Sequence, residues 1–463
     1  MDVKDLQGAG LFVPYDKLNP NTVNEVKYRI IDTILALIGG ALWVPKGETD
    51  SLYSLIDENP NIRPVWPLGL KTSLEMAGFL NAYFIRYVDW GDTYRRHRGG
   101  VGGHPSDQIG AILALCDTPG MSGRKIIELT HLAYQLYSVI QEQMLWSRPD
   151  IDYTTTLSLT TPVIAATCFN ETPQIAQNAL NLSASSGILL EQIRRDVTNL
   201  KSAASAYSIA RGLWCYRFSK AIQAPDSMFE GEYGWYKVVA PLEGELKSLG
   251  SEFTYEPIQV KSFPCCNAAQ SAVECALNLY KKNKITEQLR EIQRITIYAS
   301  EVEAKIVNKP EQAKYPECHA DADHHIRYCT ATALQFGSLT PLHYSDKYLQ
   351  DKLTRHLIDI MEVKVLTNEE SAALDNQEGA CILEISLKDG EALSESTSRA
   401  SGVLHGLETA EREKRFKDVI ERKREMIEKA SGLNLSPISE TVMELEDYDG
   451  CSLLDRIQSS LSD

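Results

Sequence analysis

The hydrophobic periodicity changes near residue 260, and this change constrains the fold more than any other feature of the sequence. Upstream of it, Val23, Val26, Ile30 and Ile34 recur at helical spacing. Downstream, "EIQRITIYAS" (residues 291–300) shows the short β-rich alternation of a strand. The sequence therefore predicts a mainly α fold in which an α+β domain follows a long helical part.

The helical part is expected to start with a helix at Pro20, where Pro20-Asn21-Thr22 forms a start signal, and this helix is expected to stop at Gly39-Gly40. Further helices are predicted at residues 73–87, 106–115, 123–144, 155–167, 172–189, 202–222 and 234–249. Two signals mark the start of the helix predicted at 172–189. Thr172 can cap it, and Pro173 fits its first turn.

The α+β part alternates strands with helices. Strands are predicted at residues 291–300, 361–367 and 380–396, the last with an Asp389-Gly390 hairpin signal. Helices are expected between them at residues 268–282, 323–336 and 348–360. A charged amphipathic helix follows. The predicted domains are a helical domain (1–261), an inserted smaller α+β lid domain (262–398) and C-terminal helices that return to the helical domain (399–463).

Composition excludes several classes of protein. The net charge of −16 argues against nucleic acid or an anionic membrane surface as the main partner. The longest apolar run, residues 30–44, is too short to span a bilayer and carries Asp32, so we expect a buried helix. The N-terminus lacks the pattern of a signal or transit peptide, and a soluble, cytoplasmic protein is expected. The ten cysteines include no Cys-x-x-Cys, which predicts free thiols and no structural zinc or iron–sulfur cluster.

The most polar loop of the helical part is "YVDWGDTYRRHRGGVGGHPSDQIG" (residues 87–110). It lies between two predicted helices, where free N–H groups suit an anion. His104 would start the second helix, with Ser106 or Asp107 as its cap. The alternative is a solvated, flexible Arg-Gly loop.

Three further features have both a functional and a structural interpretation. The histidine-rich segment "ECHADADHHIRYCTA" (residues 317–331) is either a metal or acid–base site or a capped, partly buried helix start. Lys201 either binds a carboxylate or is an ordinary surface lysine. Cys265-Cys266 lacks a histidine in its own segment, which favours buried, inert thiols over a nucleophile.

Four ordered segments together resemble the MmgE/PrpD family, which includes 2-methylcitrate dehydratases and cis-aconitate decarboxylases. The segments are "FIRYVDWGDTY" with "HPSDQIGAILAL", then "KSAASAYSIARG", "SFPCCNAAQSAVECALNLY" and "HADADHHIRYCTATALQFGSLT". Their number and order make the resemblance far more specific than any one motif.

The resemblance implies an all-helical domain built from both chain ends, an inserted α+β lid, a site between them, a homodimer and no cofactor or metal. The implied activity is dehydration of a 2-alkylcitrate, a tricarboxylate, to an alkyl-aconitate. The residues that it suggests for catalysis are His104, Asp89, Asp92, Thr93, Lys201 and Tyr153. Those suggested for substrate binding are Arg86, Arg95, Ser106, Arg211, Asp323, His324 and Cys266.

Two positions depart from the family pattern. Relatives carry a histidine where Ala268 aligns, and many carry another where Tyr153 aligns, so two imidazoles are missing relative to them. Tyr153 can still donate a proton or a hydrogen bond, whereas Ala268 cannot. The proton route could have moved, for example to His97 or His325. Two alternatives to the dehydratase therefore stay open: a decarboxylase or double-bond isomerase of an aconitate-like acid, and an inactive, carboxylate-binding member of the family.

Overall fold

The computed structural model divides the chain into two compact units, which are described one at a time. Unit 1 contains Met1–Tyr87, Gly91–Ile258 and Ile420–Asp463, and unit 2 contains Val88–Trp90 and Gln259–Val419. The residues that the structure describes are 12–56, 63–66, 69–96, 102–145, 147–195, 198–242, 254–283, 285, 288–374 and 379–460.

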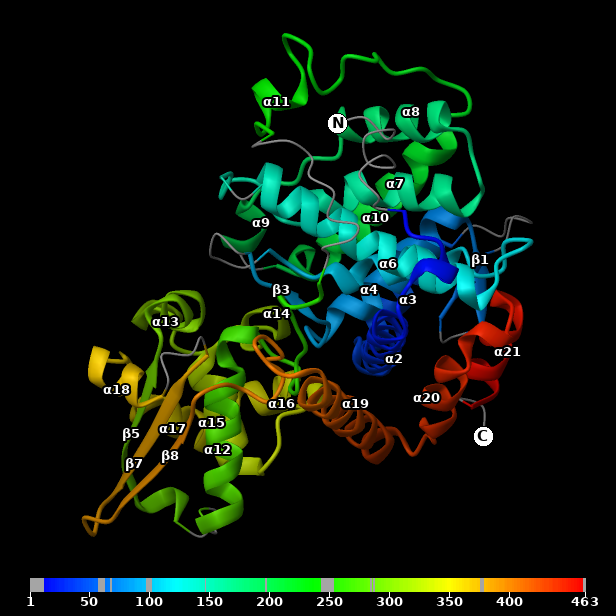
Figure 1. The fold of residues 1–463 in the computed structure, drawn as a ribbon. Coiled ribbons are helices and arrows are strands. Elements are labelled where there is room, and N and C mark those ends of the chain that lie inside the picture. Colours follow the sequence, from blue (N-terminus) through cyan, green and yellow to red (C-terminus); the bar gives the residue numbers. More distant parts are fainter. Residues whose placement is uncertain are drawn as a thin grey trace. The chain divides into compact units, whose positions relative to one another are not determined.

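Unit 1 is built mainly from helices (Figure 1). Its described helices are α2 (Pro20–Trp43), α3 (Lys46–Tyr53), α4 (Leu74–Tyr87), α5 (Ile109–Ala114), α6 (Gly123–Ile140), α7 (Thr155–Cys168), α8 (Pro173–Ala184), α9 (Gln192–Arg195), α10 (Leu200–Phe218), α11 (Trp235–Val238), α20 (Ser436–Met443) and α21 (Gly450–Ser460). The short 3-10 or π turns are η1 (Tyr15–Lys17), η2 (Pro105–Gln108), η3 (Gln141–Leu145) and η9 (Leu445–Asp447). The short strands are β1 (Arg63–Val65), β2 (Leu70–Thr72), β3 (Thr93–Tyr94) and, at the boundary of the unit, β4 (Ile258–Gln259).

The helix α2 confirms the predicted start but not the predicted stop. The Asn19 side chain accepts a hydrogen bond from the Thr22 N–H at 2.8 Å, which caps the helix in front of Pro20. The helix then continues through both glycines to Trp43. A Cβ atom on Gly40 would lie 1.9 Å from the backbone oxygen of Phe84 in α4. Glycine here therefore allows two helices to approach closely and does not end one.

Other predicted helix ends differ for identifiable reasons. The cap at Thr172 is confirmed, because its side chain accepts from the Ile175 N–H at 3.4 Å, but α8 ends at Ala184. The helix predicted at 234–249 is described only as α11, and residues 243–249 lie outside the described part. His104 precedes η2 without a side-chain cap, so the expected capping by Ser106 or Asp107 is wrong.

The C-terminal part of unit 1 is joined to α2 by a buried ion pair. Lys423 Nζ lies 2.5 Å from Asp32 Oδ1, and both side chains are almost fully buried. The charge of Asp32, which interrupts the long apolar run, is thus neutralised by a lysine nearly four hundred residues later in the sequence. Within the described residues no single helix is long and apolar enough to cross a membrane; α2 and α3 pass such a test only as a pair bent by 102°.

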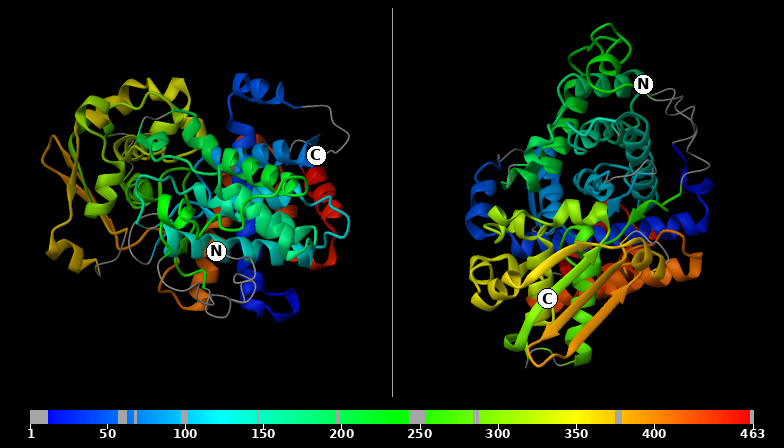
Figure 2. Two further views of the ribbon diagram at one scale, coloured as in Figure 1. Left: turned by 90° about the horizontal axis from the view of Figure 1, so that it is seen from above. Right: turned by 90° about the vertical axis from the view of Figure 1, so that its left-hand side faces the viewer.

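Unit 2 has a four-stranded sheet in the order β6-β5-β7-β8 (Figure 2, right). The strands are β5 (Ile292–Ala299), β6 (Met361–Val365), β7 (Cys381–Leu387) and β8 (Ala392–Thr397). The helices are α12 (Gln270–Asn283), α13 (Glu301–Val307), α14 (His319–Ala322), α15 (Ile326–Phe336), α16 (Asp346–Leu349), α17 (Lys352–Asp359) and α18 (Asn368–Ala373), with 3-10 turns η4 (Asn267–Ala269), η6 (Leu289–Glu291), η7 (Glu311–Ala313) and η8 (Pro341–Tyr344). The strand β5 pairs parallel with β6 and antiparallel with β7.

Helices α12 and α15 pack together, and α12 also contacts β7 and β8. The buried core between them includes Val273, Leu334, Ile297 and Leu383. The predicted hairpin at Asp389-Gly390 is confirmed, because β7 and β8 pair antiparallel and Gly390 has a φ of 93°. The alternating burial of β7 explains why its sequence showed a strand pattern.

The boundaries of unit 2 lie outside the predicted range of 262–398. It begins at Gln259 and ends at Val419, inside the continuous helix α19 (Thr409–Ser431). Because this helix has no break, no linker marks the boundary in the sequence. The tripeptide Val88–Trp90 also belongs to unit 2, although helical sequence surrounds it.

Candidate active site

His104 is buried at the start of η2 with a defined orientation. Its Nδ1 forms a short hydrogen bond with the backbone carbonyl of Asp92. Because a carbonyl can only accept, the Nδ1 carries a proton, and in the neutral ring the lone pair is on Nε2. The imidazole packs edge-to-face against Tyr153, with ring centroids 5.6 Å apart. His104 therefore has the tautomer that a general base requires.

Gly103 makes this arrangement sterically possible. Its φ is 85°, and a Cβ atom there would lie 2.0 Å from the Tyr153 ring. The flanking backbone is paired, because the Tyr94 N–H donates to the Gly103 carbonyl and the Gly102 N–H donates to the Tyr94 carbonyl, each at 2.8 Å. The ends of the polar loop are therefore held together, while residues 97–101, including His97, lie outside the described part.

The Asp92 carboxylate is a structural anchor as much as a candidate catalyst. Its Oδ2 accepts from Arg29 Nη1 at 3.0 Å and from the Tyr134 hydroxyl at 2.7 Å, and its Oδ1 accepts from the Ser106 N–H at 3.0 Å. Its side chain therefore does not orient His104; its backbone carbonyl does. Neither Arg29 nor Tyr134 was expected from the sequence.

Asp107 is a buried carboxyl that the sequence suggested only as a cap. Its Oδ2 accepts a hydrogen bond from the Ser205 hydroxyl of α10. Burial raises the pKa of Asp107 to about 7, although the Arg86 guanidinium and Ser205 act in the opposite direction. Among the described residues, its Oδ1 has no hydrogen-bond partner. A carboxyl with this pKa can hold or release a proton near neutral pH.

Tyr153 lies between His104 and a second ion pair. Arg194 Nε donates to Asp152 Oδ2 at 2.7 Å, and its guanidinium lies 4.6 Å from the centroid of the Tyr153 ring. Burial raises the pKa of Tyr153 to about 12 despite the nearby Arg194 and Arg86. Tyr153 therefore keeps its proton at neutral pH and can act as a donor. Arg194 had no recognisable signal in the sequence.

Lys201 is not a surface lysine. Its side chain is 4% exposed at the start of α10, and its backbone carbonyl accepts from Arg194 Nη1 at 3.1 Å. The surface alternative for Lys201 is therefore wrong. Arg86, at the end of α4, and Thr93, in β3, are also buried in unit 1.

The two other arginines suggested for substrate binding have contacts of their own in unit 1. Arg95 is half-buried, and its backbone N–H donates to the Pro257 carbonyl at 2.8 Å. Arg211 lies on a side of α10 that carries exposed aromatic residues, where its Nη2 donates to the Tyr207 hydroxyl at 3.1 Å. The next loop residue, Arg96, donates from Nε to Gln141 Oε1 at 3.0 Å, so the described part of the loop is not simply a solvated face.

Unit 2 contains a separate polar cluster around Asp89. Lys261 Nζ lies 2.8 Å from Asp89 Oδ1 and donates to the Asp89 carbonyl at 2.9 Å. Asp89 has a φ of 46°, which is unfavourable for a residue other than glycine. The two bonds from Lys261 hold this strained backbone in place. Lys261 was not predicted, because nothing in its sequence distinguishes it from other lysines.

Asp323, His324 and Cys266 complete the cluster in unit 2. His324 Nδ1 lies 2.5 Å from Asp323 Oδ1 and 3.8 Å from Asp89 Oδ2. The Cys266 N–H donates to the Asp323 carbonyl at 2.7 Å. Burial raises the pKa of the Cys266 thiol, but His324 and Lys261 outweigh it and hold this pKa below its ordinary value. Both adjacent cysteines are buried free thiols, as predicted, and the inertness of Cys266 stays a prediction.

The cluster does not favour a metal ion. Asp89, Asp323 and His324 offer oxygen and nitrogen atoms within 4.8 Å of one another. However, the Lys261 ammonium already neutralises Asp89, and a divalent cation would compete with it. His325 instead caps α15, because its side chain accepts from the Tyr328 N–H at 3.3 Å. This bond confirms the alternative of a capped helix start for that segment.

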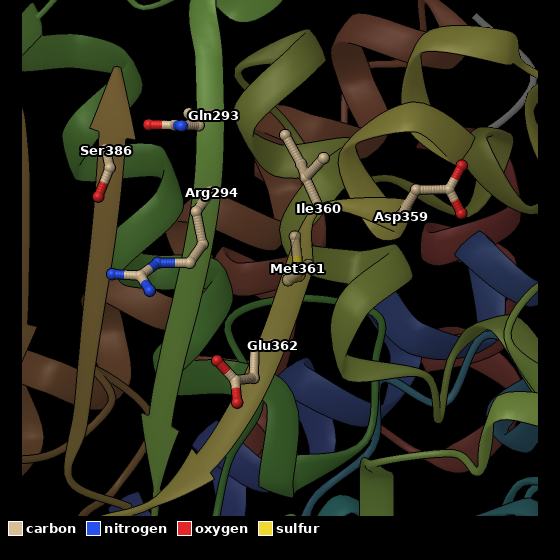
Figure 3. Close-up of a pocket in the computed structure, with 7 residues that line it drawn as sticks. All are labelled: Gln293, Arg294, Asp359, Ile360, Met361, Glu362 and Ser386. Carbon is tan, nitrogen blue, oxygen red and sulfur yellow. The ribbon is translucent and has the colours of Figure 1, made fainter. Parts of the chain in front are cut away.

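A surface hollow of about 550 Å³ lies on unit 2, apart from the residues of this cluster (Figure 3). It is lined by Gln293, Arg294, Asp359, Ile360, Met361, Glu362 and Ser386. Figure 3 shows Arg294 extending from β5 toward β7, whereas Asp359 points away from the strands. The hollow contains none of the predicted site residues.

Comparisons with known proteins point to one family. The MmgE/PrpD N-terminal domain matches residues 12–244, and the MmgE/PrpD C-terminal domain matches residues 263–428. A 2-methylcitrate dehydratase of Salmonella typhi is 26% identical over 64% of this chain. A probable 2-methylcitrate dehydratase of Saccharomyces cerevisiae is 24% identical over 69% of this chain and 66% of its own length. The 2-methylcitrate dehydratase-like protein oryR of Aspergillus oryzae is 22% identical over 82% of this chain and 81% of its own length.

The match spans 63% of the length of the Salmonella typhi relative. The two domain models, by contrast, cover most of this chain and adjoin near the change in periodicity at residue 260. The chain belongs to the MmgE/PrpD family.

Proposed function

We propose that the chain is a hydro-lyase that removes water from 2-methylcitrate or a related 2-alkylcitrate, without a metal or organic cofactor. The observation that carries this proposal is His104, a buried histidine whose Nδ1–H is held by a backbone carbonyl. The names of the relatives support the substrate class. The chemistry requires a base, an acid and cations, and unit 1 contains candidates for all three.

His104 is the proposed base. Elimination starts with removal of a proton from the carbon next to a carboxylate, and a neutral Nε2 can accept it. The imidazolium that forms keeps its Nδ1–H bond to the Asp92 carbonyl, so the ring need not reorient. The Asp92 carboxylate fixes the loop through Arg29 and Ser106.

Asp107 and Tyr153 are the proposed acids. The departing hydroxyl must receive a proton, and at its pKa of about 7 Asp107 is protonated in about half of the molecules at neutral pH. Burial raises the pKa of Tyr153 to about 12, so this tyrosine retains its proton at this pH. Either group can therefore replace a missing imidazole as a donor.

Cationic side chains are the proposed clamp for the carboxylates of the substrate. Lys201 and Arg86 are buried in unit 1, where a low dielectric strengthens their attraction for an anion. Thr93 and Ser106 add short polar groups. On a chain of charge −16, such local positive groups would select the trianion.

We also propose a homodimer, with α10 in its interface. Leu200, Tyr207, Trp214 and Phe218 are exposed, and their spacing of seven and four residues puts them on one side of this helix. Trp214 and Phe218 stack with centroids 5.8 Å apart. An aromatic stripe of this kind on a helix is typical of a surface that a partner covers.

The proposal is tested with purified, chelator-treated protein and two substrates, 2-methylcitrate and a longer 2-alkylcitrate. The conjugated alkene is followed by absorbance and the product by mass. Loss of water from either supports the dehydratase, and a preference between them measures the alkyl pocket. Loss of carbon dioxide from an aconitate-like acid would instead establish the decarboxylase. Binding without turnover, seen as ligand-induced stabilisation, would establish an inactive carboxylate-binding protein.

A further inference from the structure

The Arg194 guanidinium, in α9, contacts three other residues of unit 1. Its Nε and Nη2 donate to the two carboxylate oxygens of Asp152, at 2.7 and 3.3 Å. Its Nη1 donates to the backbone carbonyl of Lys201 at 3.1 Å. Its carbon lies 4.6 Å from the centroid of the Tyr153 ring. All three nitrogens of Arg194 already have acceptors within the protein, so this arginine is suited to arranging its neighbours rather than to binding a ligand.

The anchor of this guanidinium is itself held in place. The Asp152 side chain is fully buried, and the Arg194 side chain is 11% exposed. Asp152 Oδ1 also accepts from the Thr154 N–H at 2.9 Å, and the Asp152 N–H donates to the Leu189 carbonyl at 2.9 Å. Arginine presents its donors in a rigid, planar fork, which a lysine does not reproduce. The position of Arg194 is therefore fixed by several directional bonds.

The other two contacts of Arg194 are residues that the proposed reaction uses. Tyr153 is one of the proposed acids, and its ring packs against that of His104, the proposed base, with centroids 5.6 Å apart. Lys201 belongs to the proposed clamp, lies in the first turn of α10 and is 4% exposed. Tyr153 and Lys201 come from separate segments of the sequence. Because Arg194 contacts both, it links the proton donor to the clamp.

The charge of Arg194 also acts on the chemistry of Tyr153. A cation near a phenol favours the phenolate and so makes the hydroxyl a better proton donor. Burial raises the pKa of Tyr153, whereas Arg194 and Arg86 act in the opposite direction, and the result is a pKa of about 12. When Tyr153 donates, its proton goes to the substrate hydroxyl, which departs with the C–O electron pair as water. The phenolate that remains faces the guanidinium.

We propose that Arg194 is a positioning residue for this reaction, which holds the Tyr153 phenol beside His104 and fixes the first turn of α10 that carries Lys201. This inference rests on the proposed hydro-lyase function. It adds a residue that the sequence did not suggest and that acts through its neighbours, because its own nitrogens already donate within the protein. Loss of Arg194 is expected to change both kcat, through the proton donor, and KM, through the clamp.

The test compares Arg194→Gln with Arg195→Gln in the full chain. Arg195 is the next residue of α9, is 68% exposed and lies 3.3 Å from Glu191, so it is a matched control of the same charge. With 2-methylcitrate as substrate, Arg194→Gln should lower kcat per folded molecule roughly tenfold or more and raise KM. Arg195→Gln should leave both near the wild-type values. Arg194→Lys, which keeps the charge but not the fork, should still raise KM.

A second measurement follows Tyr153 without any turnover. The chain is labelled with 3-fluorotyrosine, whose phenol titrates at lower pH than that of tyrosine. The fluorine resonance of residue 153 is identified by its loss in Tyr153→Phe. Arg194→Gln should raise the pKa of this phenol by about one unit or more, because a nearby cation is removed. Arg194→Lys and Arg195→Gln should keep it close to the wild-type value. A role in stability alone would not move this pKa in the folded protein.

A folded Arg194→Gln variant with wild-type kcat and KM would overturn the proposal, and so would an unchanged pKa of residue 153 in that variant. Equal losses in Arg194→Gln and Arg195→Gln would also overturn it. If Arg194→Gln does not fold, Arg194→Lys decides, because a wild-type KM there would show that the fork is not needed. If the wild type does not convert 2-methylcitrate, the proposed function fails, and the fluorine titration then decides whether Arg194 controls Tyr153.

Discussion

Lys261 binds Asp89 twice, through the carboxylate at 2.8 Å and the backbone carbonyl at 2.9 Å, and each side chain is only 1% exposed. The two residues are far apart in sequence but belong to the same unit. One ammonium group thus neutralises a buried carboxylate and holds a backbone φ of 46°. The pair therefore combines electrostatic and conformational stabilisation.

Lys261→Met should be strongly destabilising. It leaves the Asp89 carboxylate buried without its cation, and breaking a buried ion pair in this way costs about 3–5 kcal/mol. The free energy of unfolding in urea measures the loss. Lys282→Met is the matched control, because Lys282 is exposed in its pair with Glu395, and we expect a change of about 0.5 kcal/mol or less. A loss at Lys261 no larger than that of the control would contradict the expectation.

His104→Ala should abolish turnover while leaving the protein folded. Removal of a general base typically lowers the rate by about 10²–10⁴-fold. His131→Ala is a matched control: His131 is also buried in unit 1, where its Nδ1 bonds to the Tyr255 hydroxyl. It should lose stability without a comparable loss of rate per folded molecule. Near-wild-type activity of His104→Ala would remove this residue from the mechanism.

Asp107 should make stability decrease as pH rises. The pKa of an unfolded aspartate is about 3.9, so between that pH and about 7 the native state binds more protons than the unfolded state. Asp107→Asn should remove this dependence. The free energy of unfolding of the variant, taken relative to that of the wild type, should therefore increase by roughly 2 kcal/mol from about pH 5 to about pH 8. Unfolding in urea at both pH values gives the comparison.

Asp152→Asn is the control of opposite sign. Burial alone would raise the pKa of Asp152, but Arg194 and Thr154 outweigh it and hold the pKa below its usual value. Its stabilising effect is therefore present at neutral pH and is lost in acid. The Asp152→Asn variant should be less stable than the wild type at about pH 8. If both substitutions shift stability in the same direction with pH, the assignment for Asp107 is wrong.

Chelator treatment should leave turnover of 2-methylcitrate unchanged. The proposed reaction uses protonated side chains and cationic residues, and Lys261 supplies the positive charge next to Asp89. The measurement compares rates before and after chelation and after adding back divalent ions. A rate that falls with chelator and returns with one metal would refute the cofactor-free proposal.

Trp214→Glu should convert the proposed dimer to a monomer. The Trp214 side chain is 53% exposed, and a charge in the middle of the aromatic stripe would have to be desolvated on association. Light scattering after gel filtration measures the mass. Tyr233→Glu, at an 85% exposed tyrosine outside α10, should leave the mass unchanged. A monomeric wild type would refute the dimer itself.

Local sequence signals predicted the elements of the fold better than their ends. The cap at Thr172, the hairpin at Gly390 and the strand pattern of β7 depend on residues close in sequence, and the structure confirms them. The predicted helix end at Gly39-Gly40 was wrong because glycine can either end a helix or allow two helices to approach closely. The sequence alone does not distinguish these roles, whereas the contact of Gly40 with the Phe84 backbone shows the second.

Long-range partners account for what the sequence did not show in the candidate site. Resemblance to the family pointed to Asp89, Asp92 and His104, but Lys261, Arg29 and Arg194 carry no local motif. Likewise His324, which lowers the pKa of the Cys266 thiol against the effect of burial, lies in another segment of the sequence. Ion pairs and hydrogen bonds of this kind are set by tertiary packing, which a single sequence does not encode in its spacing.

The assignment of Val88–Trp90 to unit 2 has a practical consequence for dissecting the protein. If the chain is cut at the apparent boundary near residue 260, the C-terminal fragment lacks the Asp89 carboxylate, and its Lys261 would be buried without an anion. The complementary fragment would expose three residues that belong to another core. We therefore expect neither piece to fold as an autonomous module, and co-expression of the two halves, rather than expression of either alone, to recover a native second unit.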